Sequence, residues 1–225
     1  MVSIEILKKV PFFSVLKDRE ILAVIPMFKE KKFARNSVIF TQEEEGNTFF
    51  FIIDGRVKVV ILSRGGREVI LAILGKHDFF GEMSLIDDMP RSATLIALED
   101  TSIIFLKRED FLAKLIKYPE MALRLMQEMS KRIRRADERI NSLSALNVYG
   151  RVAGVILEIV KASGKTIPEG FLIEKRPTHN DIAGMAGTTR ETVSRIMKDL
   201  RSRGFLKMDG RGMIVYHAQF DFNNE

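Results

Sequence analysis

The stretch from 178 to 200, THNDIAGMAGTTRETVSRIMKDL, constrains the fold more than any other part of the chain. Its apolar residues recur at spacings that let two short helices bury one side against each other. The apolar residues are Ile182, Ala186, Val193 and Ile196. Ala183 is small where the two backbones must approach closely, and Gly187 occupies the turn, where a residue tolerant of positive φ is favoured. The pattern predicts a helix-turn-helix.

The second of these helices has a polar face. Thr188 and Glu191 fit the capping box S/T-x-x-E that opens a helix. The face opposite the apolar residues carries Arg190, Glu191, Ser194 and Arg195. Arginine can donate two hydrogen bonds to guanine and glutamate can accept one from cytosine, so this face predicts a helix that reads the major groove of DNA. The alternative is an ordinary solvated helix face on which Glu191 merely caps the helix.

Length and composition limit the class of protein. A chain of 225 residues is long enough for two domains of roughly 100–200 residues each. No apolar run approaches the roughly 18 residues of a membrane span, and the N-terminal MVSIEILKKV has no signal-peptide pattern, so we expect a cytoplasmic protein without a membrane partner. Cysteine is absent, which excludes disulfides and thiolate-held iron–sulfur clusters. The three histidines, His77, His179 and His217, are too scattered to suggest a metal site and are expected in surface or turn positions.

The net charge of +6 is unevenly distributed. Residues 1–118 contain 18 Lys and Arg against 17 Asp and Glu, whereas residues 119–225 contain 18 against 13. The window 175–211 alone holds nine basic and four acidic residues. An excess of positive charge centred on the expected helix-turn-helix is typical of a protein that binds a phosphate backbone.

Turn glycines divide the first part of the chain into short strands. They are Gly46, Gly55, Gly65, Gly66, Gly75 and Gly81, close to the spacing of roughly 8–12 residues typical of an all-β roll or barrel. We expect Asp54-Gly55 to form a type I′ hairpin and residues 64–67 to separate the next two strands. Segments 93–98 and 102–106 continue the pattern around a turn at Asp100. Residues 3–26 are predicted to be helical and to cover one end of the roll.

From about Pro119 the apolar residues alternate in steps of four and three. They are Ala122, Met126, Met129, Ile133, Ala136, Ile140 and Leu143. This is the a/d spacing of a coiled-coil seam, and charged residues occupy the other faces. The pattern favours a long helix that pairs with the same helix of a second copy, giving a homodimer. The alternative is a helix that lies on the surface of its own domain.

The segments that follow complete the predicted organisation. Residues 147–150 interrupt the seam and are the expected hinge, followed by a helix to about Val160, a turn at 163–164 and a loop through 168–170. Beyond the helix-turn-helix, residues 203–212 have the pattern of a two-stranded wing. We therefore expect an α+β chain with a β-roll sensor domain over 1–118, a dimerisation helix over 119–146 and a winged helix-turn-helix domain over 147–225.

A second group of polar residues lies in segment 80–94, FGEMSLIDDMPRSAT. Gly81 and Glu82 would open a short helix after a strand and present free backbone N–H groups to an anion. Arg91 offers a planar fork to a phosphate, Ser92 adds a hydroxyl donor, and Glu82 can accept hydrogen bonds from ribose hydroxyls. The alternative is a surface ion pair between Glu82 and Arg91.

The β-roll, the FGE…PRSAT segment, the long helix and the DIA…RETVSR segment together resemble the catabolite-activator and fumarate–nitrate-regulator (Crp–Fnr) family of bacterial transcription regulators, over essentially every residue. The resemblance implies a cyclic-nucleotide-binding roll in which Arg91 and Ser92 hold the cyclic phosphate and Glu82 the ribose. It also implies a backbone contact at Gly81 and an Arg132 side chain that reaches toward Glu82 or the base. The implied ligand site comprises Gly81, Glu82, Met83, Ser84, Arg91, Ser92, Arg132, Ala136 and Asp137.

The base-reading end of this site departs from the family pattern. Cyclic-AMP-responsive members carry a Thr-Ser pair on the dimer helix that hydrogen-bonds the adenine, whereas this chain has Ala136 and Asp137. Alanine cannot make that bond, but Asp137 could accept one from an exocyclic amine. Cyclic AMP is the leading effector, with another nucleotide or no ligand as alternatives. The missing cysteines exclude the family's iron–sulfur branch, and a haem is disfavoured for want of axial ligands.

The resemblance also implies how DNA is read. Arg190 and Arg195 would contact guanines and Glu191 a cytosine, in a palindrome with TGTGA-like half-sites. Ser194 also matches the fumarate–nitrate-type readers, which leaves the second base of the half-site open. Phosphate contacts are expected from Thr178, His179, Asn180, Thr189 and Thr192. RNA polymerase is a further expected partner.

These observations predict a homodimeric, ligand-responsive transcription regulator. An enzyme is not expected, because the sequence offers no nucleophile–base pair, Walker loop or metal cluster. One alternative is a nucleotide-binding regulatory module of an enzyme complex, which leaves the helix-turn-helix without a purpose. Another is a ligand-independent DNA-binding protein in which segment 80–94 is only a structural contact.

Overall fold

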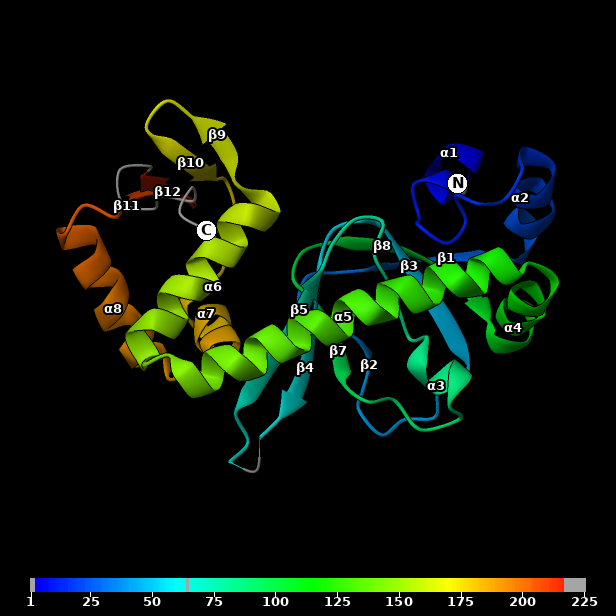
Figure 1. The fold of residues 1–225 in the computed structure, drawn as a ribbon, viewed down its shortest axis with the longest axis horizontal. Coiled ribbons are helices and arrows are strands. Elements are labelled where there is room, and N and C mark those ends of the chain that lie inside the picture. The colour runs from blue at the N-terminus through cyan, green and yellow to red at the C-terminus, as the bar shows by residue number, and fades with distance from the viewer. Residues whose placement is uncertain (1–2, 64, 217–225) are drawn as a thin grey trace. The chain divides into compact units, whose positions relative to one another are not determined.

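A computed structural model describes residues 3–63 and 65–216 (Figure 1). The chain forms two compact units, Met1–Ala136 and Asp137–Glu225. Each unit combines helices with antiparallel sheets, in agreement with the α+β class expected from the sequence. The predicted division at residues 118 and 146 stays a prediction, since the long helix α5 (Pro119–Ala145) belongs in part to each unit.

The N-terminal unit contains two four-stranded antiparallel sheets. The first has the order β1 (Lys29–Phe33), β8 (Thr101–Lys107), β3 (Thr48–Asp54) and β6 (Phe79–Phe80). The second has the order β2 (Val38–Phe40), β7 (Thr94–Ala97), β4 (Val57–Leu62) and β5 (Glu68–Leu74). Strands that are consecutive in sequence often belong to different sheets, so the chain winds as a roll rather than as a simple meander. The predicted β-roll is confirmed.

The turn at Asp54-Gly55 was expected to be a type I′ hairpin, and this expectation is wrong. Strand β3 pairs with β8 and β6, whereas β4 pairs with β5 and β7, so the turn carries the chain from one sheet to the other. Only Gly55 has a positive φ, of 90°, while a type I′ turn needs two such residues. A Cβ at Gly55 would lie 2.7 Å from the Asp100 carbonyl oxygen, which explains the glycine at this corner. The predicted turn between β4 and β5 is a hairpin, with Arg64 outside the described residues.

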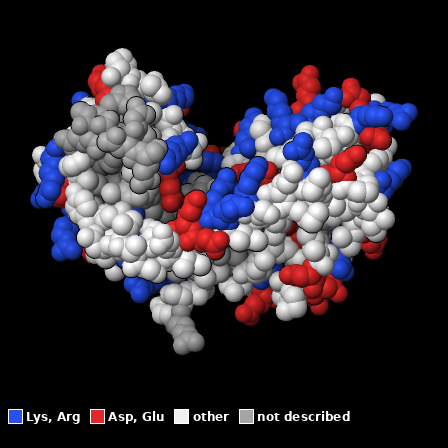
Figure 2. Space-filling view, in the orientation of Figure 1, with Lys and Arg blue, Asp and Glu red and all other residues white. Residues whose placement is uncertain are grey.

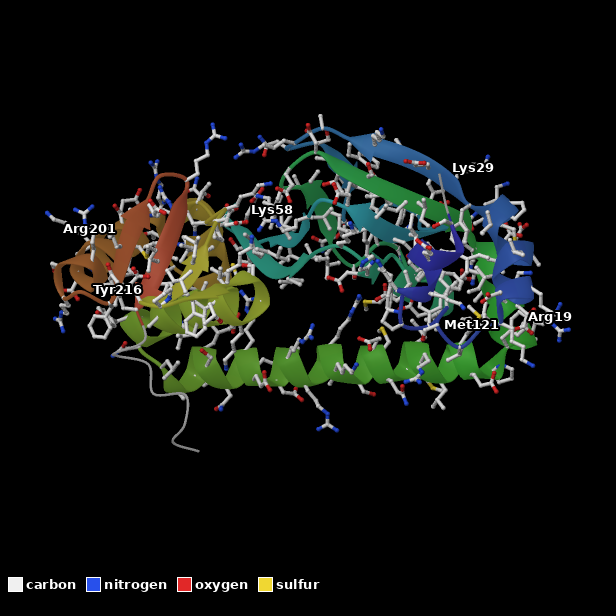
Figure 3. The ribbon with its side chains drawn as sticks, turned by 90° about the horizontal axis from the view of Figure 1, so that it is seen from above. Arg19, Lys29, Lys58, Met121, Arg201 and Tyr216 are labelled. Atoms are coloured by element: carbon white, nitrogen blue, oxygen red, sulfur yellow. The ribbon has the colours of Figure 1, made fainter. Side chains whose placement is uncertain are left out.

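Phenylalanines fill the core of this unit. The buried rings of Phe49 and Phe111 stack with centroids 4.1 Å apart, and Phe12 lies edge-on to Phe49 at 5.4 Å. Helices α1 (Ile4–Lys8) and α2 (Asp18–Val24), a 3-10 turn (Ile25–Met27) and α4 (Arg108–Lys117) gather at one end of the roll, as predicted for residues 3–26 (Figure 1). Met121 of α5 points into the same core, which fixes the start of the long helix to the roll (Figure 3).

Helix α5 has one buried and one exposed apolar side. Met121 and Leu125 are buried in the core of the N-terminal unit. The predicted seam faces away from that core, and its large residues have exposed fractions of 58% at Met126, 60% at Ile133, 63% at Ile140 and 47% at Leu143. Ala122 and Met129 are half-buried, and Ala136 is exposed. The helix therefore lies on its own domain through a different face from the seam.

The C-terminal unit packs three helices against a four-stranded sheet. Its helices are α6 (Val148–Ser163), α7 (His179–Ala186) and α8 (Arg190–Ser202). Its strands have the order β11 (Leu206–Asp209), β12 (Gly212–Tyr216), β10 (Gly170–Ile173) and β9 (Lys165–Ile167). Strands β11 and β12 form the predicted wing, with a turn in which Gly210 has a φ of 53°. The winged helix-turn-helix is confirmed, and His217 lies outside the described residues.

Three details of this unit differ from the prediction. Residues 168 and 169 of the expected loop are the turn of a β9–β10 hairpin that the sequence did not predict, because its strands are too short to give a clear alternating pattern. Helix α6 continues to Ser163, three residues beyond the expected end. The interruption after α5 is confined to residues 146 and 147, because the Asn147 side chain accepts a hydrogen bond from the Gly150 amide at 2.9 Å and opens α6. No helix among the described residues has the length and apolar character of a membrane span.

Candidate functional sites

Segment 80–94 forms a tight polar cluster beside strand β6. The strand delivers Gly81 and Glu82 to the start of the short helix α3 (Met83–Ile86), as expected. Gly81 has a φ of 83°, and a Cβ at this position would lie 2.8 Å from Arg91 Nη1 and 2.9 Å from the Thr48 carbonyl oxygen. Both the backbone conformation and the close approach therefore require glycine here.

Arg91 is the centre of this cluster and is only 5% exposed. Its Nη1 donates to the Gly81 carbonyl at 2.9 Å and to Ser84 Oγ at 2.8 Å, and its Nη2 donates to the Thr48 carbonyl at 2.8 Å. The guanidinium also lies 4.4 Å from the centroid of the Phe40 ring. Burial lowers the pKa of Arg91. Of its five N–H donors, one on Nε and one on Nη2 have no acceptor among the described residues.

Glu82 is buried, with 2% of its surface exposed, and it pairs with the long helix. Arg132 Nη1 donates to Glu82 Oε1 at 2.9 Å, and Arg132 Nη2 donates to the Phe79 carbonyl at 2.6 Å. Glu82 Oε2 is also buried but has no hydrogen-bond partner among the described residues. Burial raises the pKa of Glu82 even though the Arg132 and Arg91 charges oppose this shift. The alternative of a surface ion pair between Glu82 and Arg91 is wrong, because the carboxylate is buried and bonds Arg132 instead.

The other residues of the implied ligand site differ in how closely they join this cluster. Ser84 is buried against Arg91. Ser92 is exposed, and its hydroxyl donates to Met83 Sδ at 3.6 Å. Ala136, one helical turn beyond Arg132 on α5, is exposed, and so is Asp137. The structure thus brings together Gly81, Glu82, Met83, Ser84, Arg91, Ser92 and Arg132.

Sequence reasoning missed several residues that shape this cluster. Thr48 and the rings of Phe40 and Phe50 hold the Arg91 guanidinium, and Gly46 lets its backbone approach Ser84 and Arg91. These residues precede Arg91 by more than forty positions. Among them, only Gly46 was singled out in the sequence, and then as a turn residue rather than as part of a site.

The helix-turn-helix begins with a capping box that the sequence analysis did not identify. Thr178 Oγ1 accepts from the Asp181 amide at 3.1 Å, and the Asp181 carboxylate accepts from the Thr178 amide at 3.0 Å. The turn after α7 has Gly187 with a φ of 61°, as predicted. The apolar residues expected between the two helices are buried, and they are Ile182, Ala183, Ala186, Val193 and Ile196.

The start of α8 differs by one residue from the prediction. Thr189 is the N-cap, and its Oγ1 accepts from the Thr192 amide at 3.3 Å. The predicted capping box of Thr188 and Glu191 is therefore wrong, because the helix begins one residue later and brings Thr192 to the third helical position. Glu191 does not cap the helix, which removes the simplest structural explanation for its presence.

The polar face of α8 is exposed as predicted. Arg190, Glu191, Ser194 and Arg195 line a shallow depression together with Lys198. Basic side chains gather over α8 at the edge of the C-terminal unit (Figure 2), and Arg201 projects from the same helix away from the protein (Figure 3). The expected phosphate contacts lie at the starts of α7 and α8. Thr178, Asn180 and Thr189 are exposed, and His179 and Thr192 are half-buried.

Comparison with known families matches one domain model to each part of the chain. Residues 30–118 match a cyclic nucleotide-binding domain, and residues 150–218 match a Crp-like helix-turn-helix domain. The chain is 34% identical over 202 residues to the cyclic AMP receptor protein of Thermus thermophilus, covering 90% of each chain. The chain belongs to the Crp–Fnr family.

Solved structures of Crp–Fnr proteins share this fold. The structure of the c-di-GMP-responsive regulator CLP of Xanthomonas campestris superposes with a TM-score of 0.76 at 20% identity, covering 89% of this chain and 99% of that one. The catabolite activator protein of Thermus thermophilus superposes with a TM-score of 0.55 at 33% identity, covering 92% and 94%. The family assignment makes the chain a DNA-binding transcription regulator with a ligand-binding domain, and not an enzyme. The described residues contain no group of side chains suited to a metal ion.

We expect the Glu82→Gln substitution to change how the stability of this Crp–Fnr protein depends on pH. Burial raises the folded-state pKa of Glu82 above its ordinary value of 4.5. The stability that this group contributes is therefore fully present below that value and is lost as the pH rises through the folded pKa. Glutamine does not titrate, so the free energy of unfolding of E82Q relative to the wild type should increase over that window, by at most about 1.4 kcal/mol per pH unit.

Urea unfolding of both proteins at a series of pH values measures this difference. The matched control is Glu109→Gln, which makes the same substitution at an exposed carboxylate at the start of α4. A constant difference between E82Q and the wild type would contradict the account of the buried carboxylate.

Proposed function

We propose that this chain is a homodimeric transcription regulator whose affinity for DNA is controlled by a cyclic nucleotide bound at segment 80–94 and helix α5. The observation that carries the proposal is the buried Glu82 carboxylate, which has one oxygen on Arg132 and the other without a partner among the described residues. A buried acceptor left unsatisfied is costly unless a ligand completes it. A ribose hydroxyl is the donor that a cyclic nucleotide would supply there.

The phosphate end of the proposed site is Arg91, with Ser92 and the Gly81 backbone beside it. The two N–H donors of Arg91 that have no acceptor among the described residues suit a phosphate oxygen, and the exposed Ser92 hydroxyl can turn from Met83 toward the same anion. A rival proposal treats the cluster as purely structural, because Arg91 already makes three hydrogen bonds within the protein. The two proposals differ in whether a cyclic nucleotide binds.

Cyclic AMP is the effector we propose first. The support is the sequence relationship to proteins named for cyclic AMP, including the cyclic AMP receptor protein of Thermus thermophilus. Ala136 and Asp137 stand where the family's adenine-binding pair is expected, and Asp137 can accept from the exocyclic amine of either purine. Cyclic di-GMP, to which the related CLP protein responds, is therefore the second candidate.

For DNA, we propose that Arg190 and Arg195 bind guanines and that Glu191 binds a cytosine in TGTGA-like half-sites of a palindrome. The exposed, mainly basic depression on α8 supports this assignment. The side chains at the starts of α7 and α8 would contact phosphates and set the position of the helix in the groove. Such a regulator acts with RNA polymerase in the cytoplasm, where its DNA partner lies.

The proposed dimer forms through the α5 seam. Four large apolar side chains, Met126, Ile133, Ile140 and Leu143, are 47–63% exposed along one line of the helix, and a second copy would bury them. We propose domains 1–118 for sensing, 119–146 for dimerisation and 147–225 for DNA binding. Ligand binding would shift the equilibrium between orientations of the DNA-binding domain about residues 146 and 147.

Arg91→Ala should abolish or strongly weaken cyclic nucleotide binding. The loss of charge-assisted hydrogen bonds to a phosphate corresponds to a decrease in affinity of roughly tenfold or more. Calorimetric titration of the full chain with cyclic AMP and with cyclic di-GMP measures the affinities. Because Arg91 also holds the fold together, Ser92→Ala, an exposed position, provides the milder variant, with an expected loss of roughly fivefold. Absence of binding by the wild type to either nucleotide would favour the structural role.

Arg195→Ala should weaken binding to the palindrome by roughly 1–3 kcal/mol and change binding to a scrambled duplex much less. Gel shift or fluorescence anisotropy on both duplexes measures the two losses. The control is Arg201→Ala, which removes an exposed positive charge from the last turn of the same helix. It should weaken both complexes equally. Equal losses for R195A on the two duplexes would exclude base recognition by this residue.

Ile133→Lys should convert the dimer into a monomer, because each copy would place a charge in the apolar seam. Sedimentation velocity at micromolar concentration reports the mass of the wild type and the variant. Gln127→Lys adds the same charge at an exposed position of α5 outside the seam and should stay dimeric. A wild-type protein that sediments as a monomer would refute the proposed dimer.

A further inference from the structure

Two arginines lie close enough to the start of α7 to act on the charge of its first residue. His179 is the first residue of the helix, directly after the capping Thr178, and it is half-buried. Burial lowers the pKa of His179, and the positive charges of Arg176 and Arg190 lower it further. The free protein thus disfavours the imidazolium at a place where two other cations already lie.

The charged groups near His179 belong to three segments of the C-terminal unit. Arg176 lies in the segment before α7, and its amide donates to the Arg211 carbonyl in the turn of the wing at 3.2 Å. The Nε of Arg176 is buried and has no hydrogen-bond partner among the described residues. Arg190 is the exposed first residue of α8. On α7 itself, the only nearby carboxylate is that of Asp181, which is engaged in the capping box with Thr178.

An anion would complete this arrangement. Because Thr178 Oγ1 satisfies the Asp181 amide, the preceding amides of His179 and Asn180 point out of the helix end without an acceptor among the described residues. These amides, the helix dipole and the two arginines all favour negative charge at the same place. A DNA phosphate is the anion that the proposed docking of the helix-turn-helix would bring there.

We propose that His179 is a proton-linked phosphate contact, which takes up a proton when the helix-turn-helix engages the DNA backbone. The proposal rests on the proposed contact of the start of α7 with DNA. An incoming phosphate replaces repulsion between cations by attraction, so it stabilises the charged imidazole that the free protein disfavours. Arginine at this position would contact the same phosphate without any response to pH, whereas histidine titrates near neutrality.

The direction of the effect follows from linkage. In the complex the pKa of His179 is higher than in the free protein, so DNA binding takes up protons between the two values. The affinity for DNA should therefore decrease as the pH rises through that window, by at most about tenfold per pH unit for each proton, and a dimer has one His179 in each protomer. Below both pKa values the ring is charged in either state, and above both it is neutral in either state, so the dependence vanishes outside the window. Because a phosphate carries no sequence information, palindromic and scrambled duplexes should show the same dependence.

The test measures DNA affinity between about pH 5.5 and about pH 8, where histidine titrates. Full-length wild type, His179→Gln and His179→Arg are compared at constant ionic strength with cyclic AMP present, on the palindromic and the scrambled duplex. The wild type should lose affinity as the pH rises. H179Q should bind weakly, as the wild type does at high pH, and H179R should bind tightly. Both variants should show little dependence on pH.

Calorimetry in two buffers with different ionisation enthalpies counts the protons directly. The wild type should take up as much as about one proton per protomer inside the window, and H179R should take up almost none. His77→Gln removes a histidine of the other unit and should behave as the wild type.

Two results would overturn the proposal. One is a wild-type affinity that does not change with pH, and the other is an H179R or H179Q variant that keeps the full pH dependence and proton uptake. Failure of the wild type to bind either duplex at any pH would instead overturn the proposed docking of the helix-turn-helix, and the proton linkage with it. The two kinds of failure are therefore distinguishable.

Discussion

The buried contact between Glu82 and Arg132 is the interaction on which the proposed ligand response depends. It joins the N-cap residue of the short helix α3 to the long helix α5 at 2.9 Å, inside a cluster where Arg91 is also buried. Removing Arg132 would leave the buried Glu82 carboxylate without its charged partner, at a cost of up to roughly 3–5 kcal/mol, so the two elements are coupled. A ligand that binds the spare oxygen of Glu82 would therefore act on the same carboxylate that holds α5. This is a physical route from the effector to the helix that carries the proposed dimer seam.

The sequence predicted those features that are encoded within a few residues of each other. The period of three and four along α5, the glycine between α7 and α8 and the exposed face of Arg190, Glu191 and Arg195 all follow from local helix geometry. The wrong prediction at Asp54-Gly55 depended on a distant part of the chain. Asp54-Gly55 is a normal hairpin sequence, but the pairing of β3 with β8 places it at a corner between sheets. The capping error at Thr188 was local, because two successive threonines could each open the helix and the sequence does not decide between them.

The ligand cluster was predictable in composition but not in its contacts. The resemblance to the Crp–Fnr family placed Arg132 near Glu82, and the structure confirms their hydrogen bond. The partners of Arg91, including Thr48 and the Phe40 ring, come from strands far away in sequence and carry no motif. The same holds for His179, because the sequence alone does not show that Arg176 and Arg190 lie close enough to lower its pKa. Long-range packing thus determines which charges and how much burial act on Glu82 and His179. Local sequence patterns only identify these residues as candidates.

The central proposal is that a nucleotide bound at the roll controls DNA recognition by α8. The most direct test compares the DNA affinity of the full-length wild-type protein with and without cyclic nucleotide. Fluorescence anisotropy on the palindromic and the scrambled duplex, with cyclic AMP or cyclic di-GMP, measures it in one experiment. The account predicts that one of the nucleotides increases affinity for the palindrome more than for the scrambled duplex. Identical affinities with and without each nucleotide, on both duplexes, would contradict it.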